Sequence, residues 1–318
     1  MLSHHGFKSF EEAGKMVLKY LHNHFDFSLW MITRTEGDDW IVLQSEDNCY
    51  GVKQGKVFRW ADSFCSQMVQ GRAPRIAPSS GHIPLYREAG INQLVNIKSY
   101  VGQPLTKEDG TLFGTLCAID PQPQSENILE NAELFELLAQ MLSYILQAEL
   151  REAQQIRETE HFEAQAHSDP LTGLFNRRAW DKLIKSEEKR CQQYGHPAAV
   201  LIIDLNDLKI TNDSLGHVAG DMLIKRTALT LKNNVRSNDI VARLGGDEFA
   251  ILSIETNLEN AKKLVLRIKN ALLEANISAA IGLEMRDPTY GLSAAIIEAD
   301  KKMYKDKASI KSNSTFIR

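Results

Sequence analysis

Three acidic residues stand where the chain is expected to turn sharply, and their spacing suits metal-assisted chemistry. Asp204 follows the apolar run A-A-V-L-I-I at 198–203, and ligands commonly bind where the strands of α/β sheets end. Gly245-Gly246 predicts a tight hairpin, with Asp247 and Glu248 at its tip. Carboxylates on adjacent strands can hold two divalent ions about 3.5–4 Å apart, which bind a triphosphate and activate a hydroxyl. On residue chemistry alone, the alternative is that these acids are solvated turn residues.

The region around these acids has the pattern of an α/β domain. A polar loop and a helical stretch follow the strand predicted at 198–204, and two short strand patterns flank Gly245-Gly246. The sequence I-S-A-A-I-G-L predicts a further strand at 277–283. Residues from about 166 to 318 are therefore expected to alternate helices and strands around one sheet.

A long helix is expected to precede this domain. Residues 126–166 contain no Pro or Gly and are rich in Leu, Ala, Glu and Gln, which predicts a helix of ~60 Å at ~1.5 Å per residue. Its apolar residues follow a 4-3-4-3 spacing typical of a helix-pairing seam: Leu134, Leu138, Met141, Ile145 and Ala148. The helix could instead pack on its own domain, but its length and its seam together favour pairing with a second copy.

The N-terminal region mixes helical and strand patterns. Strands are predicted at 40–44 and at 111–119, where β-branched and aromatic residues gather. The pair Asp109-Gly110 predicts a hairpin turn just before the second of these strands.

The overall composition is that of a globular protein without a strong electrostatic field. Of the 318 residues, 43% are hydrophobic and 25% charged, and the formal net charge of −4 gives no reason to expect DNA binding. The longest apolar runs are too short to cross a bilayer and no secretion signal begins the sequence, so a cytoplasmic protein with no membrane partner is expected. The four cysteines include no C-x-x-C pair and are expected to be reduced thiols.

The C-terminal region resembles a known family along its whole length. The string G-G-D-E-F at 245–249 is the signature of the GGDEF family of diguanylate cyclases. The segments S-D-P-L-T-G-L-F-N-R-R at 168–178 and A-D-K-K-M-Y-K-D-K at 299–307 resemble the family's opening segment and closing helix. Between them, the segment 204–221 resembles its metal and guanine segment in register throughout. The resemblance implies a palm-like domain that condenses two GTP molecules into cyclic di-GMP.

This resemblance implies a metal site that binds Mg²⁺ or Mn²⁺, two ions per GTP site. The ligands would be Asp204, the Leu205 carbonyl, Asp247 and Glu248. Such oxygen donors are what hard cations prefer. Asp247 would also serve as the base near the 3′-hydroxyl, and Lys209 would neutralise charge at the phosphates.

The resemblance also implies how GTP is recognised. Asn212 and Asp221 match the guanine-contacting pair, and an aspartate can accept hydrogen bonds from the N1–H and exocyclic amine that adenine lacks. His217 lies between them and would either contact substrate or shape the turn. Lys307 and Lys311 fall where the family places cations for the triphosphate.

A second, inhibitory site is implied by an R-x-x-D motif. Arg236 and Asp239 form this motif, which ends five residues before the G-G-D-E-F signature, at the offset where the family binds its own product. Arg267 could add a contact from a neighbouring domain. The alternative is a surface ion pair, since the tetrapeptide is common.

Two N-terminal segments, 58–77 and 96–123, resemble the middle and the end of a GAF domain. The resemblance implies a sensory domain that holds either an unidentified small ligand or none, serving dimerisation only. No cysteine is followed by histidine, as a covalent bilin would require, and the N-K-F-D-E motif of cyclic-nucleotide-binding GAF domains is missing. The expected organisation is a GAF domain at 1–125, a signalling helix at 126–166 and a GGDEF domain at 167–318, with an α+β or α/β fold class.

Two other functions compete with an active, product-inhibited cyclase. The first is a non-catalytic receptor for GTP or cyclic di-GMP, and the second is a synthase of an adenine-containing dinucleotide. The intact acids argue against the receptor, and Asp221 argues against adenine. Each domain would bind one GTP, so the cyclase mechanism needs a homodimer with two domains face to face.

Overall fold

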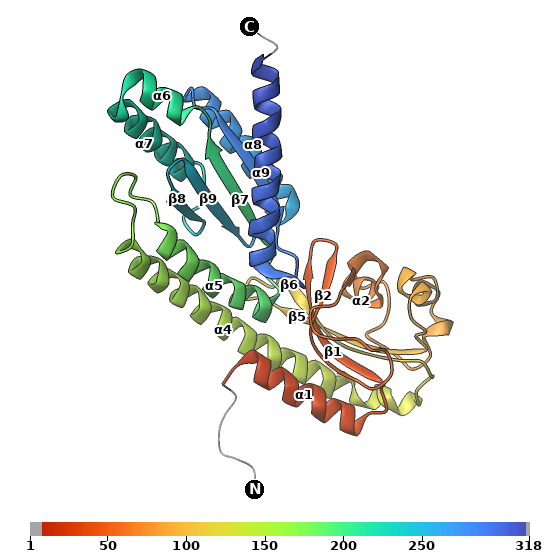
Figure 1. The fold of residues 1–318 in the computed structure, drawn as a ribbon. Helices are drawn as coiled ribbons and strands as arrows, with labels where there is room; N and C mark the ends of the chain where they lie inside the picture. Colours follow the sequence, from red (N-terminus) through yellow and green to blue (C-terminus); the bar gives the residue numbers. More distant parts are fainter. Residues whose placement is uncertain (1–7, 316–318) are drawn as a thin grey trace. The chain divides into compact units, whose positions relative to one another are not determined.

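The computed structural model describes residues 8–315, with side chains as far as residue 310. The chain divides into two compact units. Unit 1 holds the chain up to Gln155 together with Gln192–Gly195, and unit 2 holds Ile156–Cys191 together with the chain from His196 onward. Each unit has its own sheet and core (Figure 1).

Unit 1 is built on an antiparallel sheet of six strands. Their order across the sheet is β3 (Val57–Arg59), β2 (Asp39–Asp47), β1 (Leu29–Glu36), β6 (Leu112–Asp120), β5 (Ser99–Thr106) and β4 (Ile76–Ala77). The strands predicted at 40–44 and 111–119 are confirmed as parts of β2 and β6. Gly110 turns the hairpin between β5 and β6 with a φ of 77°, a backbone conformation that favours glycine.

Helices cover both faces of this sheet. Helix α1 (Phe10–His24), which Ser9 caps, and the first half of α4 (Ala132–Gln165) lie on one face. Helices α2 (Phe64–Val69) and α3 (Pro84–Arg87) lie on the other. Short 3₁₀ turns complete the unit: η1 (Trp60–Asp62), η2 (Ser80–His82), η3 (Gly90–Gln93) and η4 (Glu126–Asn131). The antiparallel sheet covered by helices confirms the fold expected of a GAF domain.

The long helix predicted before the C-terminal domain is present as α4, which η4 precedes. Its first half buries one stripe in the core of unit 1: Phe135, Ala139, Leu142 and Leu146. The predicted pairing seam runs beside this stripe. Leu138 and Ile145 pack partly against the core, whereas Met141 is 49% exposed. The helix therefore packs on its own domain and still presents part of the seam to solvent.

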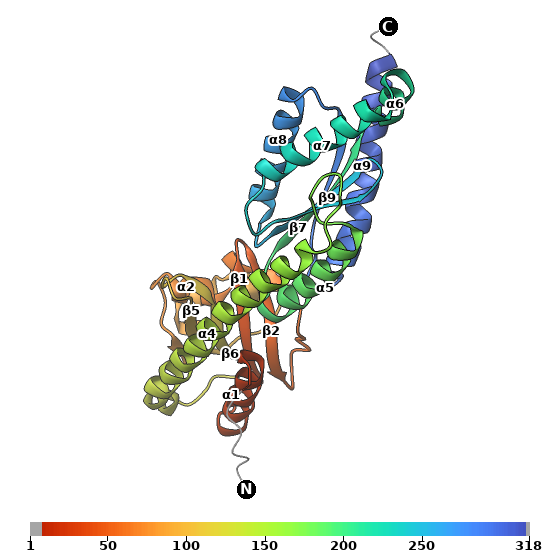
Figure 2. The same cartoon turned by 90° about the vertical axis from the view of Figure 1, so that its left-hand side faces the viewer.

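Unit 2 has a four-stranded antiparallel sheet. Its order is β10 (Ala279–Met285), β7 (Ala198–Leu205), β9 (Glu248–Ile254) and β8 (Ile240–Gly245). Helices α5 (Arg177–Tyr194) and α9 (Gly291–Thr315) cover one face, and α7 (His217–Asn233) and α8 (Leu258–Glu274) cover the other (Figure 2). The short α6 (Leu208–Leu215) follows β7. This α+β arrangement confirms the predicted fold class.

Both faces of β7 are buried, because its alternate residues enter two separate cores. Val200 and Ile202 pack under α5 and α9, and Leu201 and Ile203 pack under α7 and α8. A Cβ added to Gly282 would stand 1.9 Å from the Ala299 carbonyl oxygen. Glycine at this position of β10 therefore lets α9 lie directly on the sheet.

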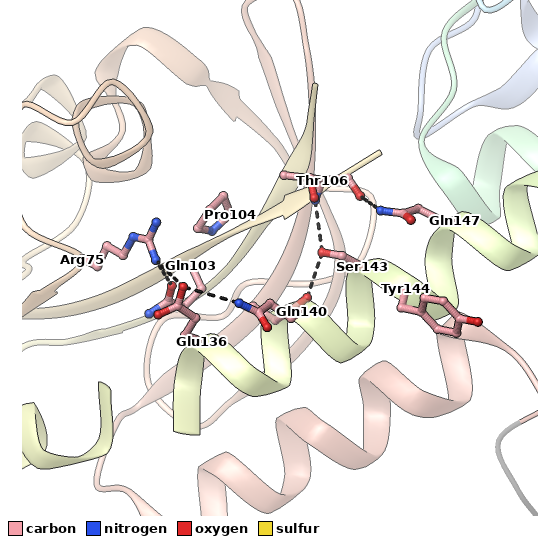
Figure 3. A pocket seen from close by; sticks show the side chains of 10 residues that line it. Arg75, Gln103, Pro104, Thr106, Glu136, Gln140, Ser143, Tyr144 and Gln147 are labelled. Atoms are coloured by element: carbon pink, nitrogen blue, oxygen red, sulfur yellow. Dashed lines mark hydrogen bonds and ion pairs between the residues drawn. The ribbon is translucent and has the colours of Figure 1, made fainter. Parts of the chain in front are cut away.

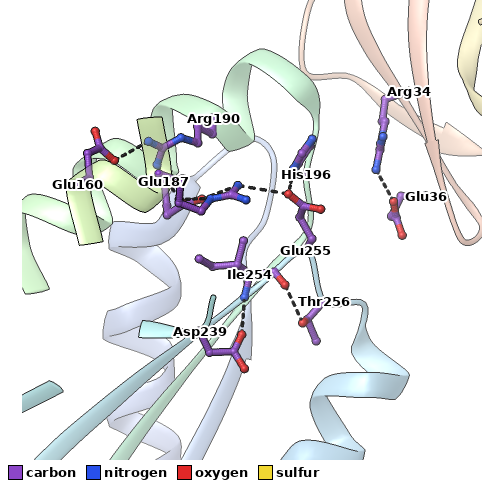
Figure 4. Close-up of polar contacts among 11 residues, drawn as sticks. Arg34, Glu36, Glu160, Glu187, Arg190, His196, Asp239, Ile254, Glu255 and Thr256 are labelled. Atoms are coloured by element: carbon purple, nitrogen blue, oxygen red, sulfur yellow. Dashed lines mark hydrogen bonds and ion pairs between the residues drawn. The ribbon is translucent and has the colours of Figure 1, made fainter. Parts of the chain in front are cut away.

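A buried polar network fastens the second half of α4 to α5 within unit 2 (Figure 4). The Nε of Arg157 on α4 donates to Glu187 on α5 at 2.8 Å, and Arg190 donates to the same carboxylate at 2.6 Å. Arg190 also contacts Glu160. Arg157 reaches Glu255, at the end of β9, at 3.2 Å. Burial opposes ionisation of this last carboxyl, but His196 and Arg157 hold the pKa of Glu255 at about 2.

Replacement of Glu187 by alanine should destabilise unit 2 by about 3–5 kcal/mol, because two buried guanidinium groups lose their shared carboxylate. Urea unfolding of the full chain measures this change as a shift of the unit 2 transition. The matched control is Glu259→Ala, which removes an exposed partner of Lys263 and should cost at most about 0.5 kcal/mol. Equal small losses in both variants would contradict the role given to the network.

Candidate active site

Two of the predicted acids face each other across adjacent strands. Asp204 on β7 pairs directly with Glu248 on β9, so both side chains lie on the face that α9 covers. Asp204 is 7% exposed and Glu248 is exposed. The backbone N–H of Leu205 donates to the Asp247 carbonyl at 3.1 Å, which places the hairpin tip against the end of β7. The structure thus brings together the acids that the sequence separates by more than 40 positions.

An ion pair that the sequence did not single out anchors the hairpin tip. Gly246 has a φ of 45°, and its carbonyl oxygen accepts hydrogen bonds from Arg243 Nη2 at 2.8 Å and Nε at 3.1 Å. The same guanidinium reaches Asp169 at 3.2 Å, and Asp169 accepts the Thr172 N–H at 2.9 Å. Burial raises the pKa of Asp169, but these hydrogen bonds outweigh it and lower the pKa overall. Asp169 lies in the segment 168–178 and Arg243 lies two residues before the G-G-D-E-F signature, but no spacing rule connects them.

Lysine from the closing helix reaches the same end of the sheet. The Nζ of Lys307 on α9 contacts Asp204 Oδ1 in a partly buried ion pair. The lysine predicted for the triphosphate and the aspartate predicted for metal therefore belong to one site. Lys311 belongs to the same helix, but its side chain lies outside the described residues.

Four of the residues predicted to act on GTP lie on the two helices after β7. Lys209 and Asn212 belong to α6, and His217 and Asp221 belong to α7; all except the partly buried Asn212 are exposed. The Oδ1 of Asn212 is buried and has no hydrogen-bond partner among the described residues. A Cβ at Gly220 would stand 1.9 Å from this oxygen. Glycine at this position thus makes room for an amide that could still bind a polar ligand.

The donor set beside Asp204 suits a hard cation. Next to the paired carboxylates, Asn206 donates from Nδ2 to Ser278 at 2.9 Å, and its buried Oδ1 has no hydrogen-bond partner within the described part of the chain. Side-chain amide and carboxylate oxygens are the ligands that Mg²⁺ and Mn²⁺ prefer. No group of three or more His, Cys, Asp or Glu side chains in the described residues could hold a metal by itself. A metal here would share its coordination with carbonyl oxygens and with ligand phosphates.

The R-x-x-D motif lies at the opposite end of β8, roughly 20 Å from the hairpin tip at ~3.3 Å per residue. The Asp239 carboxylate accepts the backbone N–H of Arg236 at 3.0 Å. It also accepts the backbone N–H of Ile254 at 3.1 Å (Figure 4). Arg236 is exposed. Arg267 Nε donates to the carbonyl of Asn234, which lies two residues before Arg236. A hollow of about 530 Å³ lies beside the motif and is lined by Arg236, Asp239 and His161 of α4.

Unit 1 has a polar groove between β5 and α4. Its volume is about 360 Å³ (Figure 3). The Nη1 of Arg75 donates to the buried Gln103 at 3.2 Å and pairs with Glu136 of α4 at 3.4 Å. Ser143 of α4 donates to the Ala139 carbonyl and accepts the Thr106 N–H. A molecule bound in this groove would contact the long helix directly.

The two units match two known domain families. The fold and the paired acids define a protein with a sensory-type unit followed by a nucleotide-cyclase-type unit. The GAF domain model matches residues 9–146, and the diguanylate cyclase GGDEF domain model matches residues 166–313. The chain therefore carries an N-terminal GAF domain and a C-terminal GGDEF domain.

The chain is also similar to several named proteins. The chain is 29% identical over 225 residues to the diguanylate cyclase DgcP of Escherichia coli K12. This match covers 67% of the chain and 65% of DgcP. The chain is 36% identical over 156 residues to the response regulator PleD of Caulobacter vibrioides. This second match covers 45% of the chain and 34% of PleD. Among solved structures, a sensory box/GGDEF family protein from Caulobacter crescentus is 32% identical, with a TM-score of 0.42. That match covers 45% of this chain and 99% of the solved chain. The chain thus spans less than two thirds of either curated relative.

Among the described residues, no helix combines the length and the apolar character needed to span a membrane.

Replacement of Arg243 by methionine should lower the rate of cyclic di-GMP formation about 10- to 100-fold, because the hairpin that carries Asp247 and Glu248 loses its anchor. Product formation by purified protein measures this loss, and circular dichroism checks that the fold remains. Arg87→Met, an equal change at an exposed position in unit 1, should leave the rate unchanged. Full activity in Arg243→Met would show that the anchor does not position the acids.

Proposed function

We propose that this chain is a diguanylate cyclase that condenses two GTP molecules into cyclic di-GMP and releases two pyrophosphates. The observation that carries the proposal is the in-register pairing of Asp204 with Glu248, with Asp247 at the adjacent hairpin tip. This pairing supports a site for two divalent ions per GTP, Mg²⁺ or Mn²⁺. The GGDEF domain match and the name of the relative DgcP agree with this activity.

Each group in the site has a distinct task in this mechanism. Asp204, the Leu205 carbonyl, Asp247 and Glu248 hold the ions, which when bound stabilise charge at the phosphates and make the 3′-hydroxyl easier to deprotonate. Asp247 accepts the proton of the 3′-hydroxyl. Lys307, Lys311 and Lys209 neutralise the triphosphate. Asn212 and Asp221 select guanine through hydrogen bonds that adenine cannot make, and His217 lies at the turn between their helices.

A complete reaction requires two such domains. Each domain binds one GTP, and each 3′-hydroxyl attacks the α-phosphate of the GTP on the opposite domain, which releases pyrophosphate. We assign the pairing to α4, because Met141, Leu137 and Tyr144 on this helix are large apolar side chains that remain about half or more exposed. Such residues on one long helix favour association with a second copy.

The activity is tested by product analysis. Purified protein incubated with GTP and Mg²⁺ should yield cyclic di-GMP by mass spectrometry, and Asp247→Asn should reduce turnover by at least about 10³-fold, because base and metal ligand are lost together. Asp181→Asn, at an exposed position on α5, is the matched control and should retain full turnover.

The same measurement separates the competing functions. A receptor would bind GTP or cyclic di-GMP without making product, and Asp247→Asn would leave its function unchanged. A synthase of mixed dinucleotides would incorporate ATP when both nucleotides are supplied. Binding of GTP without any product, with and without added GAF ligands, would refute the cyclase.

We further propose that cyclic di-GMP inhibits the enzyme at the R-x-x-D motif. The exposed guanidinium of Arg236 beside a hollow of about 530 Å³ supports this, since arginine grips phosphate and guanine edges through its planar fork. The Asp239 carboxylate already caps two backbone N–H groups, so its first task is to shape the loop that presents Arg236. Arg267, whose guanidinium lies near Asn234, would supply a further contact.

Replacement of Arg236 by alanine should increase the half-inhibitory concentration of cyclic di-GMP at least about tenfold, because one charge-assisted contact is lost. Initial rates measured at increasing product concentration give this value, and the uninhibited rate should stay the same. Arg178→Ala, at an exposed position on α5, is the control. Unchanged inhibition in Arg236→Ala would exclude this motif as the inhibitory site.

We propose that the GAF unit regulates this activity through α4. The helix contributes Phe135 and Leu142 to the core of unit 1 and Arg157 to the buried network of unit 2, so a change in its packing would affect both. The polar groove between β5 and α4 could hold a regulatory ligand against this helix.

A further inference from the structure

Unit 1 has a hollow on each face of its sheet, and the two differ in size and polarity. The one under α2 and α3 is lined mainly by apolar and aromatic side chains and has about 20 Å³ of space, which is room for about one water. The groove between β5 and α4 has about 360 Å³, within the ~300–1,000 Å³ of small-molecule sites. The groove is therefore the hollow that admits a small molecule without rearrangement of the core.

Contacts at one end of the groove fix α4 to the edge of the sheet. Strand β4 pairs with β5 at Tyr100 and Val101, and past these residues α4 rather than a strand lies along β5. The Thr106 N–H donates to Ser143 Oγ at 3.1 Å, and Gln147 Nε2 donates to the Thr106 carbonyl at 3.0 Å. These polar groups are committed to each other, so this end of the groove is a fixed wall.

At the other end, the polar side chains are held by longer contacts (Figure 3). Arg75 Nη1 lies 3.4 Å from Glu136 Oε1, and Gln140 Nε2 lies 3.5 Å from the same oxygen. Hydrogen bonds between N–H and oxygen are usually about 2.9–3.0 Å long. The side chains of Arg75 and Glu136 are also 49% and 52% exposed, and such an ion pair contributes little to stability. These contacts can therefore be exchanged for contacts with a ligand.

Gln103 on β5 gives the groove a buried donor. Its side chain lies on the face of the sheet that α4 covers, between Val101 and Leu105 of the core, and it is 2% exposed. Its Oε1 accepts a hydrogen bond from Arg75 at 3.2 Å, whereas its Nε2 donates to no group in the described part of the chain. A buried donor without an acceptor is unfavourable, and a ligand oxygen in the groove would satisfy it.

The charges in the lining of the groove cancel, which indicates the charge of its ligand. Arg75 and Glu136 are the charged residues of the lining, one of each sign. A dianion or a dication would place its second charge beside a like charge. A zwitterion instead offers a carboxylate to Arg75 and an ammonium to Glu136, and in an α-amino acid a single carbon joins these two groups. The rest of the lining supplies mainly amides and hydroxyls: Gln140, Ser143, Tyr144 and Gln147.

We propose that this groove binds a small zwitterion, an α-amino acid with an uncharged polar side chain. Its carboxylate accepts hydrogen bonds from Arg75 and from Gln103 Nε2, and its ammonium pairs with Glu136. The ligand thus replaces the long contact between Arg75 and Glu136 and joins β5 to α4. As the ligand that regulates the enzyme through α4, it rests on the proposed function, whereas its binding does not.

The test is isothermal titration calorimetry on the full-length chain, with L-glutamine as the probe. We expect a Kd below about 1 mM. Succinate, with two negative charges, and putrescine, with two positive charges, should each bind at least about tenfold more weakly, because one of their charges meets a like charge in the groove.

Two variants test the contacts with the carboxylate. Arg75→Met should weaken L-glutamine binding at least about tenfold, because a charge-assisted hydrogen bond is lost. Gln103→Met should weaken it about fivefold, and thermal unfolding checks that this variant remains folded. Arg87→Met, at an exposed position on α3, is the matched control and should bind as the unchanged chain does.

A change in the ligand tests the contact with the ammonium. Glu136→Gln should weaken the binding of L-glutamine at least about tenfold. N-acetyl-L-glutamine carries no ammonium, so it should bind Glu136→Gln at least as tightly as the unchanged chain. Glu88→Gln, an equal change at an exposed position in unit 1, should leave the binding of both molecules unchanged.

Absence of L-glutamine binding at millimolar concentrations would overturn the proposal. Succinate or putrescine binding as tightly as L-glutamine, or equal affinities in Arg75→Met and Arg87→Met, would overturn it as well. Calorimetry measures binding to unit 1, whereas product analysis measures the cyclase, so failure of one proposal is distinguishable from failure of the other.

Discussion

The antiparallel pairing of β7 with β9 holds the candidate active site together, because it sets Asp204 directly opposite Glu248. A slip of one residue in this register would move every side chain of one strand to the opposite face of the sheet. Such a slip is strongly disfavoured here, since alternate residues of β7 fill two different cores and all eight are buried. The hydrophobic pattern of one strand therefore determines the separation of the acids.

The remaining parts of the site are attached to this strand pair by specific contacts. Arg243 ties the carbonyl of Gly246 to Asp169, which holds the hairpin tip in place. Gly282 allows α9 to lie on β10, and α9 in turn brings Lys307 to Asp204. The site thus combines residues from an opening segment, a strand, a hairpin and the last helix, each positioned by packing rather than by sequence proximity.

The long helix α4 has a different task in each unit. Its first half buries apolar side chains against the sheet of unit 1, and its second half uses the buried Arg157, with Glu187 and Arg190 of α5, in unit 2. A close-packed apolar core transmits strain, and a buried ionic network needs its partners in place. A signal that changes the packing in unit 1 would therefore act on a rigidly attached segment in unit 2, in keeping with the proposed regulation.

The sequence by itself determined the two domain families, the long helix, the strand at 198–204 and the candidate acids, and it placed the strand at 277–283 two residues before the observed β10. These follow from local periodicity and from motifs in fixed order, which a single chain displays directly. Only the tertiary structure decided which side chains meet: Arg243 with Asp169, and Lys307 with Asp204. Each of these pairs joins residues far apart in the chain, and their contact depends on strand register and helix packing. No local pattern encodes such distances, which is why the sequence named the acids but not the groups that position them.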